Sequence, residues 1–240
     1  MKLLFITLLI IIWPLTLYAQ DSTVSPYSSK YKILISVDIS SIKPTEINDH
    51  ISTSNTLFET TTKTIKSLPE ISATATFRPL QNSNIIILRG GYMWVNRTFQ
   101  ISITETSTSP MPIGTTTGTI NETYSVYPLS IGVGMEFPPF GFQWQFEFIY
   151  GIGYIKEEGS YTSSIGRQTS YSRTLFSQAY GYRANIQETV RFSNSIGFTL
   201  EFGYRGLRFD EYEDEVTTQP SSIEFSCSGI YGSLGLSILL

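Results

Sequence analysis

The strictest pattern in the chain is an alternation of apolar with polar or small side chains between residues 142 and 154. The even positions are apolar throughout: Phe142, Trp144, Phe146, Phe148, Tyr150, Ile152 and Tyr154. The odd positions are mostly polar or small: Gln143, Gln145, Glu147, Ile149, Gly151 and Gly153. A period of two is that of a β-strand, because successive side chains point to opposite faces of a sheet. The stretch therefore predicts a strand with one apolar face and one polar or small face.

Seven further stretches alternate in the same way, the first two more weakly than the rest: residues 31–40, 70–78, 86–94, 127–137, 180–187, 196–205 and 230–240. Short connections rich in turn formers (81–84, 138–141 and 193–195) alternate with long polar ones (41–69, 104–122, 157–172 and 210–222). This order of turns and loops is the plan of a transmembrane barrel. We therefore expect residues 31–240 to form an all-β, eight-stranded antiparallel up-and-down transmembrane β-barrel. Both termini would be periplasmic and the long loops extracellular.

The chemistry of the two strand faces favours a membrane barrel over a soluble one. The less apolar face consists of Gly, Ser, Gln and isolated charges, which fit the narrow interior of eight strands, whereas the other face is bulky and aromatic, as lipid requires. The 12 steps from Phe142 to Tyr154 rise about 30 Å at ~3.3 Å per residue and a tilt near 40°, close to the apolar band with its aromatic girdles. We expect Trp144 in the periplasmic girdle. The expected outer girdle is Trp94, Tyr127, Tyr154, Tyr182 and Tyr204.

The first residues resemble a targeting signal. Lys2 precedes an apolar run that ends near Leu17, and Ala19 is a small residue before the polar Gln20. These are the marks of a secretory signal peptide, and the run is short for a membrane-spanning helix. We expect residues 1–19 to be a cleaved signal peptide and residues 20–30 to be a periplasmic lead-in to the barrel.

The end of the chain carries a further resemblance. The last eight residues are Ser233, Leu234, Gly235, Leu236, Ser237, Ile238, Leu239 and Leu240. They resemble the C-terminal sorting signal of small outer-membrane barrels of the OmpA-transmembrane-domain and OmpX type, except that Leu240 stands where these families usually carry an aromatic residue. The resemblance implies an integral protein of the bacterial outer membrane. Its implied partners are outer-membrane lipid and, through the C-terminal strand, the assembly machinery.

Composition and single residues give little support for chemistry at a site. The net charge of −4 argues against a nucleic-acid partner, and one Cys with one His excludes a disulfide framework and a Cys/His zinc site. Two lipid A-modifying enzymes resemble this architecture and use a His with a Ser, but His50 lies in a long polar connection without the context that orients a nucleophile. We expect no enzyme, cofactor or metal site. The acidic residues are read as a solubilising loop tip, although carboxylates can hold Ca²⁺: Glu211, Glu213, Asp214 and Glu215. We expect Cys227, in the last strand, to be a small filler.

The charges on the predicted inner faces bear on whether the barrel conducts. Away from the strand ends they are Asp38, Glu147 and Glu201 against Arg89, Arg183 and Arg205. Opposed charges in a low-dielectric lumen pair, so we expect an ion network that plugs the barrel. Counted from the periplasmic turns, Arg89, Glu147 and Glu201 share a lower level and the other three share a higher one. Two functions stay open: a structural or surface-interaction barrel acting through its loops, and a narrow channel or carrier of small or lipophilic solutes. The sequence does not indicate the loop partner.

Overall fold

The structure is a computed structural model that describes residues 31–42, 65, 67–79, 84–105, 114–137, 142–163, 166–217, 220–221 and 223–240. The signal peptide, the lead-in and His50 lie outside these residues. The strands are β1 (Tyr31–Ile42), β2 (Ser67–Phe77), β3 (Asn84–Glu105), β4 (Gly114–Phe137), β5 (Phe142–Ser163), β6 (Gln168–Arg191), β7 (Ile196–Phe209), β8 (Tyr212–Asp214), β9 (Pro220–Ser221), β10 (Phe225–Ser226) and β11 (Gly229–Leu239). Within the described part of the chain, no helix is long and apolar enough to cross a bilayer.

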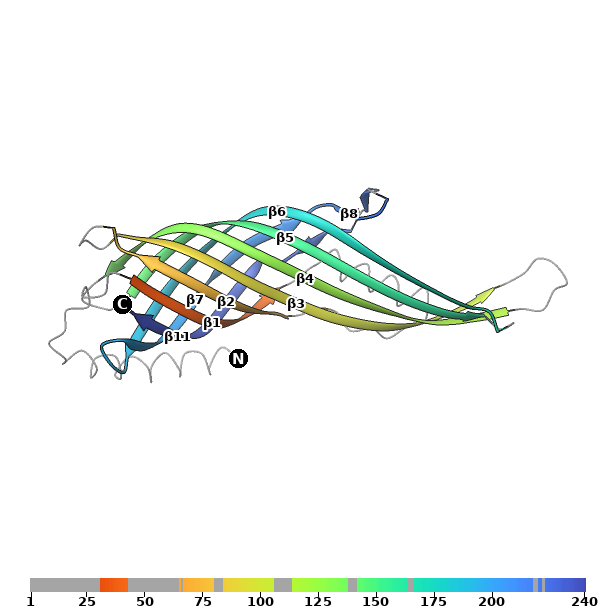
Figure 1. The fold of residues 1–240 in the computed structure, drawn as a ribbon, viewed down its shortest axis with the longest axis horizontal. Coiled ribbons are helices and arrows are strands. Elements are labelled where there is room, and N and C mark those ends of the chain that lie inside the picture. Colours follow the sequence, from red (N-terminus) through yellow and green to blue (C-terminus); the bar gives the residue numbers. More distant parts are fainter. Residues whose placement is uncertain are drawn as a thin grey trace.

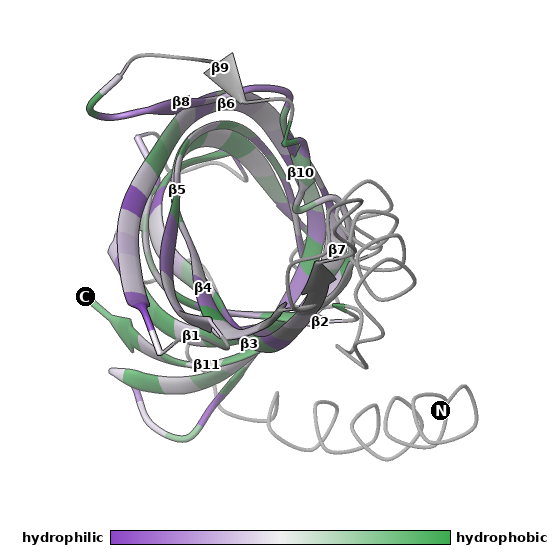
Figure 2. Cartoon of the chain, turned by 90° about the vertical axis from the view of Figure 1, so that its right-hand side faces the viewer, coloured by the Kyte–Doolittle hydropathy of each residue, from purple (hydrophilic) through white to green (hydrophobic). Residues whose placement is uncertain are grey.

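Eight of these strands close into a ring. Each pairs antiparallel with its neighbour in the order β1, β2, β3, β4, β5, β6, β7 and β11, and β11 pairs back with β1. Figure 2 shows the barrel along its axis. Figure 1 shows it from the side, with the strands tilted relative to that axis. The prediction of an eight-stranded antiparallel up-and-down barrel is confirmed. The short strands β8, β9 and β10 lie between β7 and β11, where the sequence predicts a long loop.

The connections agree with the prediction in one place and differ in two. The tight turn at 193–195 is confirmed, since Phe192 N and Ser193 N both donate to Ile196 O. Two predicted loops are mostly strand: β3 and β4 pair from Glu105↔Gly114, and β5 and β6 pair to Thr162↔Gln168. The prediction of loops over 104–122 and 157–172 is therefore wrong. Both faces of these segments are rich in Thr and Ser, so no apolar period reveals a strand that leaves the membrane.

The four middle strands consequently project beyond the rest of the barrel. Strands β3 to β6 have 22 to 24 residues, whereas β1, β2 and β11 have 11 or 12. A register row of Trp94, Ser125, Tyr154 and Phe176 crosses the four strands just above the last β2–β3 pair, Glu70↔Met93. We call the part of β3–β6 beyond this row the extension. Figure 1 shows the extension as a long, narrow sheet that projects beyond the ring.

The exterior of the ring is apolar and exposed, as a lipid-facing wall requires. Phe148 is 51% exposed, whereas Ile149, the next residue of β5, is 0% exposed. The same alternation of exposure holds for exterior side chains of the other wall strands: Ile35, Ile71, Leu88, Val133, Ile186, Phe202 and Leu236. Since large apolar side chains cover the outside and charged side chains are buried inside, the barrel is built for lipid.

Candidate functional site

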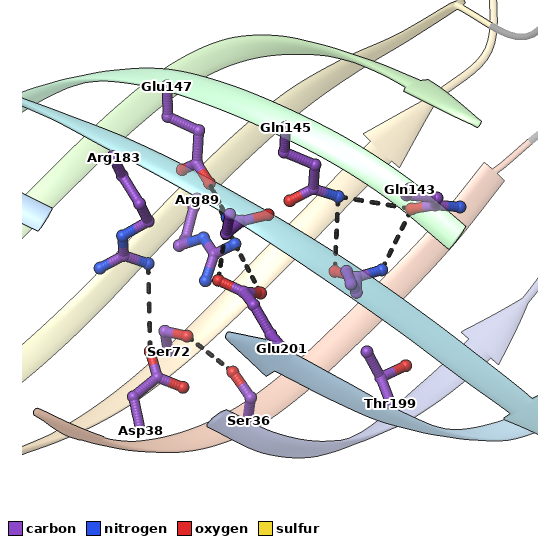
Figure 3. Close-up of polar contacts among 12 residues, drawn as sticks. Ser36, Asp38, Ser72, Arg89, Gln143, Gln145, Glu147, Arg183, Thr199 and Glu201 are labelled. Atoms are coloured by element: carbon purple, nitrogen blue, oxygen red, sulfur yellow. Dashed lines mark hydrogen bonds and ion pairs between the residues drawn. The ribbon is translucent and has the colours of Figure 1, made fainter. Parts of the chain in front are cut away.

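The lumen is the part of the molecule that could conduct, bind or catalyse, and it is filled in layers. Its periplasmic layer combines amides and hydroxyls with the ammonium group of Lys32 and the buried ion pair of Arg78 with Glu136. Gln187 Nε2 donates to Gln143 Oε1 at 3.1 Å, and Lys32 Nζ donates to Thr189 Oγ1 at 2.7 Å. Ser36 and Ser72 share a hydrogen bond of 2.8 Å across β1 and β2. Figure 3 shows the glutamines of this layer and, beside Asp38, the pair of Ser36 and Ser72, together with charged side chains outward of the glutamines.

The next layer is an ion cluster centred on one guanidinium group. Arg89 Nη2 lies 3.0 Å from Glu147 Oε1 and 2.9 Å from Glu201 Oε2. Asn185 Nδ2 donates to Glu201 Oε1 at 3.0 Å, and the Tyr231 hydroxyl donates to the same oxygen. Strands β3, β5, β6, β7 and β11 therefore all contribute to this cluster. It brings together the three residues that the sequence analysis places on the lower level.

A second ion cluster lies outward of the first, and its central residue is one that the sequence analysis does not include. Arg183 Nη2 lies 2.9 Å from Glu70 Oε1, and Arg205 Nη1 also pairs with Glu70. Arg183 Nη1 lies 3.9 Å from Asp38 Oδ2, and Arg205 Nε donates to the carbonyl oxygen of Cys227 at 3.0 Å. Glu70 shares its parity with the inward Ser72, Thr74 and Thr76 of β2. The weak alternation of that strand is the signal that could have found it.

Glu70 changes the charge balance of the lumen away from the strand ends. Four carboxylates (Asp38, Glu70, Glu147 and Glu201) face three guanidinium groups (Arg89, Arg183 and Arg205), so the expected balance of three against three is wrong. Neither carboxylate oxygen of Asp38 has a hydrogen-bond partner among the described residues. Asp38 is thus the least tightly held member of the network, while Glu70 bridges two guanidinium groups.

Outward of the ion clusters the lumen becomes apolar. A single cluster of buried side chains, which we call the stopper, fills the interior there. Its members come from β2 to β7 and from the segment between β7 and β11: Leu68, Met93, Tyr124, Val126, Ile149, Ile155, Leu175, Ala179, Leu207, Phe209, Tyr212, Phe225 and Cys227, with Ile65 beside β2. Packed interiors of this kind leave few voids as large as a water molecule. The side chains of the stopper and of the ion clusters are thus buried inside the described part of the barrel.

The stopper is shaped by a small residue and by a segment that folds inward. A Cβ atom added to Gly153 would come within 2.9 Å of the Phe209 ring, so this glycine makes room for the ring. Strand β10 pairs with β7 at Phe225↔Phe209 and brings Phe225 inside. Cys227 lies between β10 and β11, not within the last strand as expected, and is fully buried.

Two further ion pairs lie at and above the stopper, on the inward face of the extension. Arg97 pairs with Glu122 and donates to the Tyr124 hydroxyl at 2.7 Å. Arg173 Nε donates to Glu157 Oε2 at 2.5 Å. This hydrogen bond raises the pKa of the Arg173 guanidinium above its ordinary value. Charged side chains therefore continue on the inward face beyond the apolar band.

The predicted girdle residues all lie on the outer face, but at different levels. Trp94 and Tyr154 lie on the register row at the base of the extension. The ring centroids of Tyr127 and Tyr154 are 6.1 Å apart. Tyr182 lies opposite Phe148, six positions from Phe176 on β6, and Tyr204 lies opposite Ala184. Tyr182 and Tyr204 are therefore nearer the middle of the wall than the outer edge. The strands of a barrel are staggered, so counting from turns does not give their relative height. Trp144 is exposed near the periplasmic end of β5.

In the acidic cluster of the last loop, Asp214 has a structural role. Asp214 Oδ1 accepts hydrogen bonds from Val216 N and Thr217 N, both at 2.9 Å. These bonds, that from Thr217 first, hold the pKa of the Asp214 carboxyl below its ordinary value. Within the described ranges, no three His, Cys, Asp or Glu side chains are grouped as metal ligands would be. Asp214 therefore closes a turn.

The closed ring, the lipid-exposed exterior and the filled lumen define the class: an eight-stranded transmembrane β-barrel, the fold of the small outer-membrane barrels. Among solved structures, Ail, the attachment invasion locus protein of Yersinia pestis, has a TM-score of 0.40 and 15% identity over 88% of this chain and 97% of that one. OprG from Pseudomonas aeruginosa has a TM-score of 0.39 and 12% identity over 88% and 96%. No protein-family model matches the chain, and no curated protein matches it.

Proposed function

We propose that the protein is a non-enzymatic barrel of the bacterial outer membrane that carries a rigid sheet above the bilayer for contacts at the cell surface. One observation carries the proposal: the lumen is filled along its length while four strands continue past the apolar band. Strand β5 continues for nine residues beyond Tyr154, about 20 Å at ~3.3 Å per residue and a tilt near 40°. A barrel whose only role was to span the membrane would not need strands that stay paired beyond the apolar band.

A narrow channel is the competing function, and the layers of the lumen argue against it. An ion crossing the barrel would pass two clusters of paired charges and then the stopper, in which Ile149, Leu207 and Phe209 are at most 1% exposed. An apolar constriction of this kind stops ions because they must shed their hydration. The proposal therefore places the function on the extension and not in the lumen.

Two measurements on one preparation test this function. Unboiled and boiled samples on a detergent gel should migrate differently, as a folded barrel does, and planar-bilayer recordings should show no steady current above the bare membrane. The wall variant Phe148→Arg should refold poorly into vesicles, because an arginine would face lipid. A steady, ion-selective current of porin size would overturn the closed lumen and favour the channel. Identical mobility before and after boiling would contradict the membrane barrel itself.

A further inference from the structure

The outer end of the extension carries two tyrosines on its inward face whose rings cover glycines of the neighbouring strands. Tyr161 of β5 is paired in register with Gly118 of β4, and Tyr171 of β6 is paired with Gly159 of β5. A Cβ atom on Gly118 would lie 2.4 Å from the Tyr161 ring, and one on Gly159 would lie 2.0 Å from the Tyr171 ring. Each ring therefore lies over the glycine of the neighbouring strand, in space that any other side chain would occupy.

The two rings are stacked on each other. Their planes differ by 9° and their centroids are 5.8 Å apart. Burial, and secondly a side-chain hydrogen bond with Tyr161, raise the pKa of the Tyr171 hydroxyl above its ordinary value. Both side chains are partly exposed. We call this pair the tyrosine platform.

The described surroundings of the platform are polar, and their charges are the ion pair of Arg173 with Glu157 and, at the β5–β6 connection, the exposed Arg167. Toward the tip, the same face presents the hydroxyls of Thr116, Ser163 and Thr169. On the membrane side it presents Arg173, whose side chain is 45% exposed and whose Nε is paired with Glu157. A ligand on the platform would thus meet the exposed part of the stacked rings, with hydroxyls and Arg167 on the tip side and a neutralised ion pair on the membrane side.

We propose that the tyrosine platform is a binding site for a neutral saccharide, and this inference rests on the proposed surface role of the extension. The C–H groups on one face of a sugar ring fit the electron-rich face of an aromatic ring. The sugar hydroxyls can exchange hydrogen bonds with the three hydroxyl side chains and with the remaining N–H groups of Arg173.

Other ligand classes fit less well. A stacked nucleotide strand needs cations along its backbone, but the described cations near the platform are Arg173, which is paired with Glu157, and Arg167, and the chain is net acidic. A sulfated or carboxylated saccharide carries several negative charges, more than these two guanidinium groups, one of them already paired, can neutralise. The inward parity of the platform directs it away from the lipid wall, so the saccharide approaches from outside the cell and not from the surrounding lipid.

The test uses the full barrel in detergent micelles and a panel of neutral hexose oligosaccharides of four to eight units, followed by saturation-transfer NMR. We expect at least one of them to bind with a Kd of about 1 mM. Tyr161→Leu and Tyr171→Leu still cover Gly118 and Gly159 but lack the flat π face, so each should weaken binding about tenfold. Tyr161→Phe should retain most of it, because stacking does not need the hydroxyl. Tyr180→Leu, on the lipid-facing wall, is the matched control and should bind as the unmodified protein does.

Each other outcome contradicts the inference. If no neutral oligosaccharide gives a transfer signal, or if the leucine variants bind as well as the unmodified protein, the platform is not a saccharide site. If only sulfated oligosaccharides bind, the chemical class is wrong. Protease resistance of the extension, measured on every variant, shows that lost binding is not lost structure. The gel mobility and bilayer current that test the surface barrel do not depend on these results, so the two proposals can fail separately.

Discussion

The inner half of the lumen is filled by carboxylates, guanidinium groups and amides, whereas the outer half is filled by aliphatic and aromatic side chains of the same strands. On β5 the change falls between Glu147 and Ile149, and on β7 it falls between Arg205 and Leu207. Both halves exclude solvent, but for different reasons. The ion clusters depend on each charge having its partner, while the stopper depends only on volume and shape.

This difference predicts which half of the lumen tolerates substitutions least. A buried charge that loses its partner keeps its desolvation penalty, so one substitution harms the whole cluster. A buried aliphatic side chain that is shortened leaves a cavity, whose cost depends on how far its neighbours relax. The inner half should therefore be fragile and specific and the outer half more adaptable, which the following variants test in order of decreasing effect.

The largest effect is expected from Arg89→Ala. It leaves Glu147 and Glu201 buried without their shared guanidinium, and such a broken pair typically costs ~3–5 kcal/mol of unfolding free energy. The measurement is a urea titration of the barrel refolded in phospholipid vesicles. Adding Glu147→Gln should recover part of the loss, because it removes one of the stranded charges. A loss below ~1 kcal/mol, far under that range, would mean that the cluster is solvated and not closed.

Leu207→Ala tests the stopper at the position on β7 where the inward side chains change from charged to apolar. Truncating a buried leucine costs roughly 2–5 kcal/mol, and we expect about 3 because the cavity among large side chains can partly collapse. Unlike the loss for Arg89→Ala, this one should vary little with salt or pH. Leu207→Met, which nearly keeps the volume, should cost less than ~1.5 kcal/mol. A marked pH dependence of the alanine variant would show that the two halves are not independent.

Ile149→Val removes a smaller part of a side chain on β5, where the inward residues change from charged Glu147 to apolar Ile149. Removing one buried methylene typically costs ~0.5–1.5 kcal/mol. The matched control is Ile131→Val, since Ile131 is an isoleucine of the neighbouring strand that faces lipid. The control should lose much less in the same urea titration, because lipid fills the space left by the missing group. Equal losses for the two variants would contradict the assignment of a packed interior at Ile149.

The smallest effect is expected for an ion pair outside the lumen. Lys156 Nζ lies 2.6 Å from Glu158 Oε1 on the outer face of the extension, and both side chains are more than half exposed. Exposed pairs contribute ~0.2–1 kcal/mol and are screened by salt, so Lys156→Ala should lie at the low end of this range and vanish at high ionic strength. A loss as large as that of Arg89→Ala would remove the distinction between buried and exposed charges.

Part of the candidate site could be predicted from the sequence, because alternation assigns each side chain to the inside or the outside. It placed Arg89, Glu147 and Glu201 within the barrel. It missed Glu70, because β2 alternates weakly: Ser72, Thr74 and Thr76 face inward while Ala73 and Ala75 face outward, so the two faces differ little in hydropathy. It also missed the extension and its tyrosine platform, since hydroxyl side chains on both faces leave no contrast to detect.

The sequence alone thus determined what depends on one strand at a time: the number of strands, the apolar wall, the inward parity of the charges and the tight turn at 193–195. The tertiary structure decided what depends on strands far apart in the chain. Arg205 meets Glu70 across 135 residues, and the stopper combines Leu68 with Phe225. These contacts are set by the stagger at which eight strands close, a property of the whole ring that no local pattern encodes.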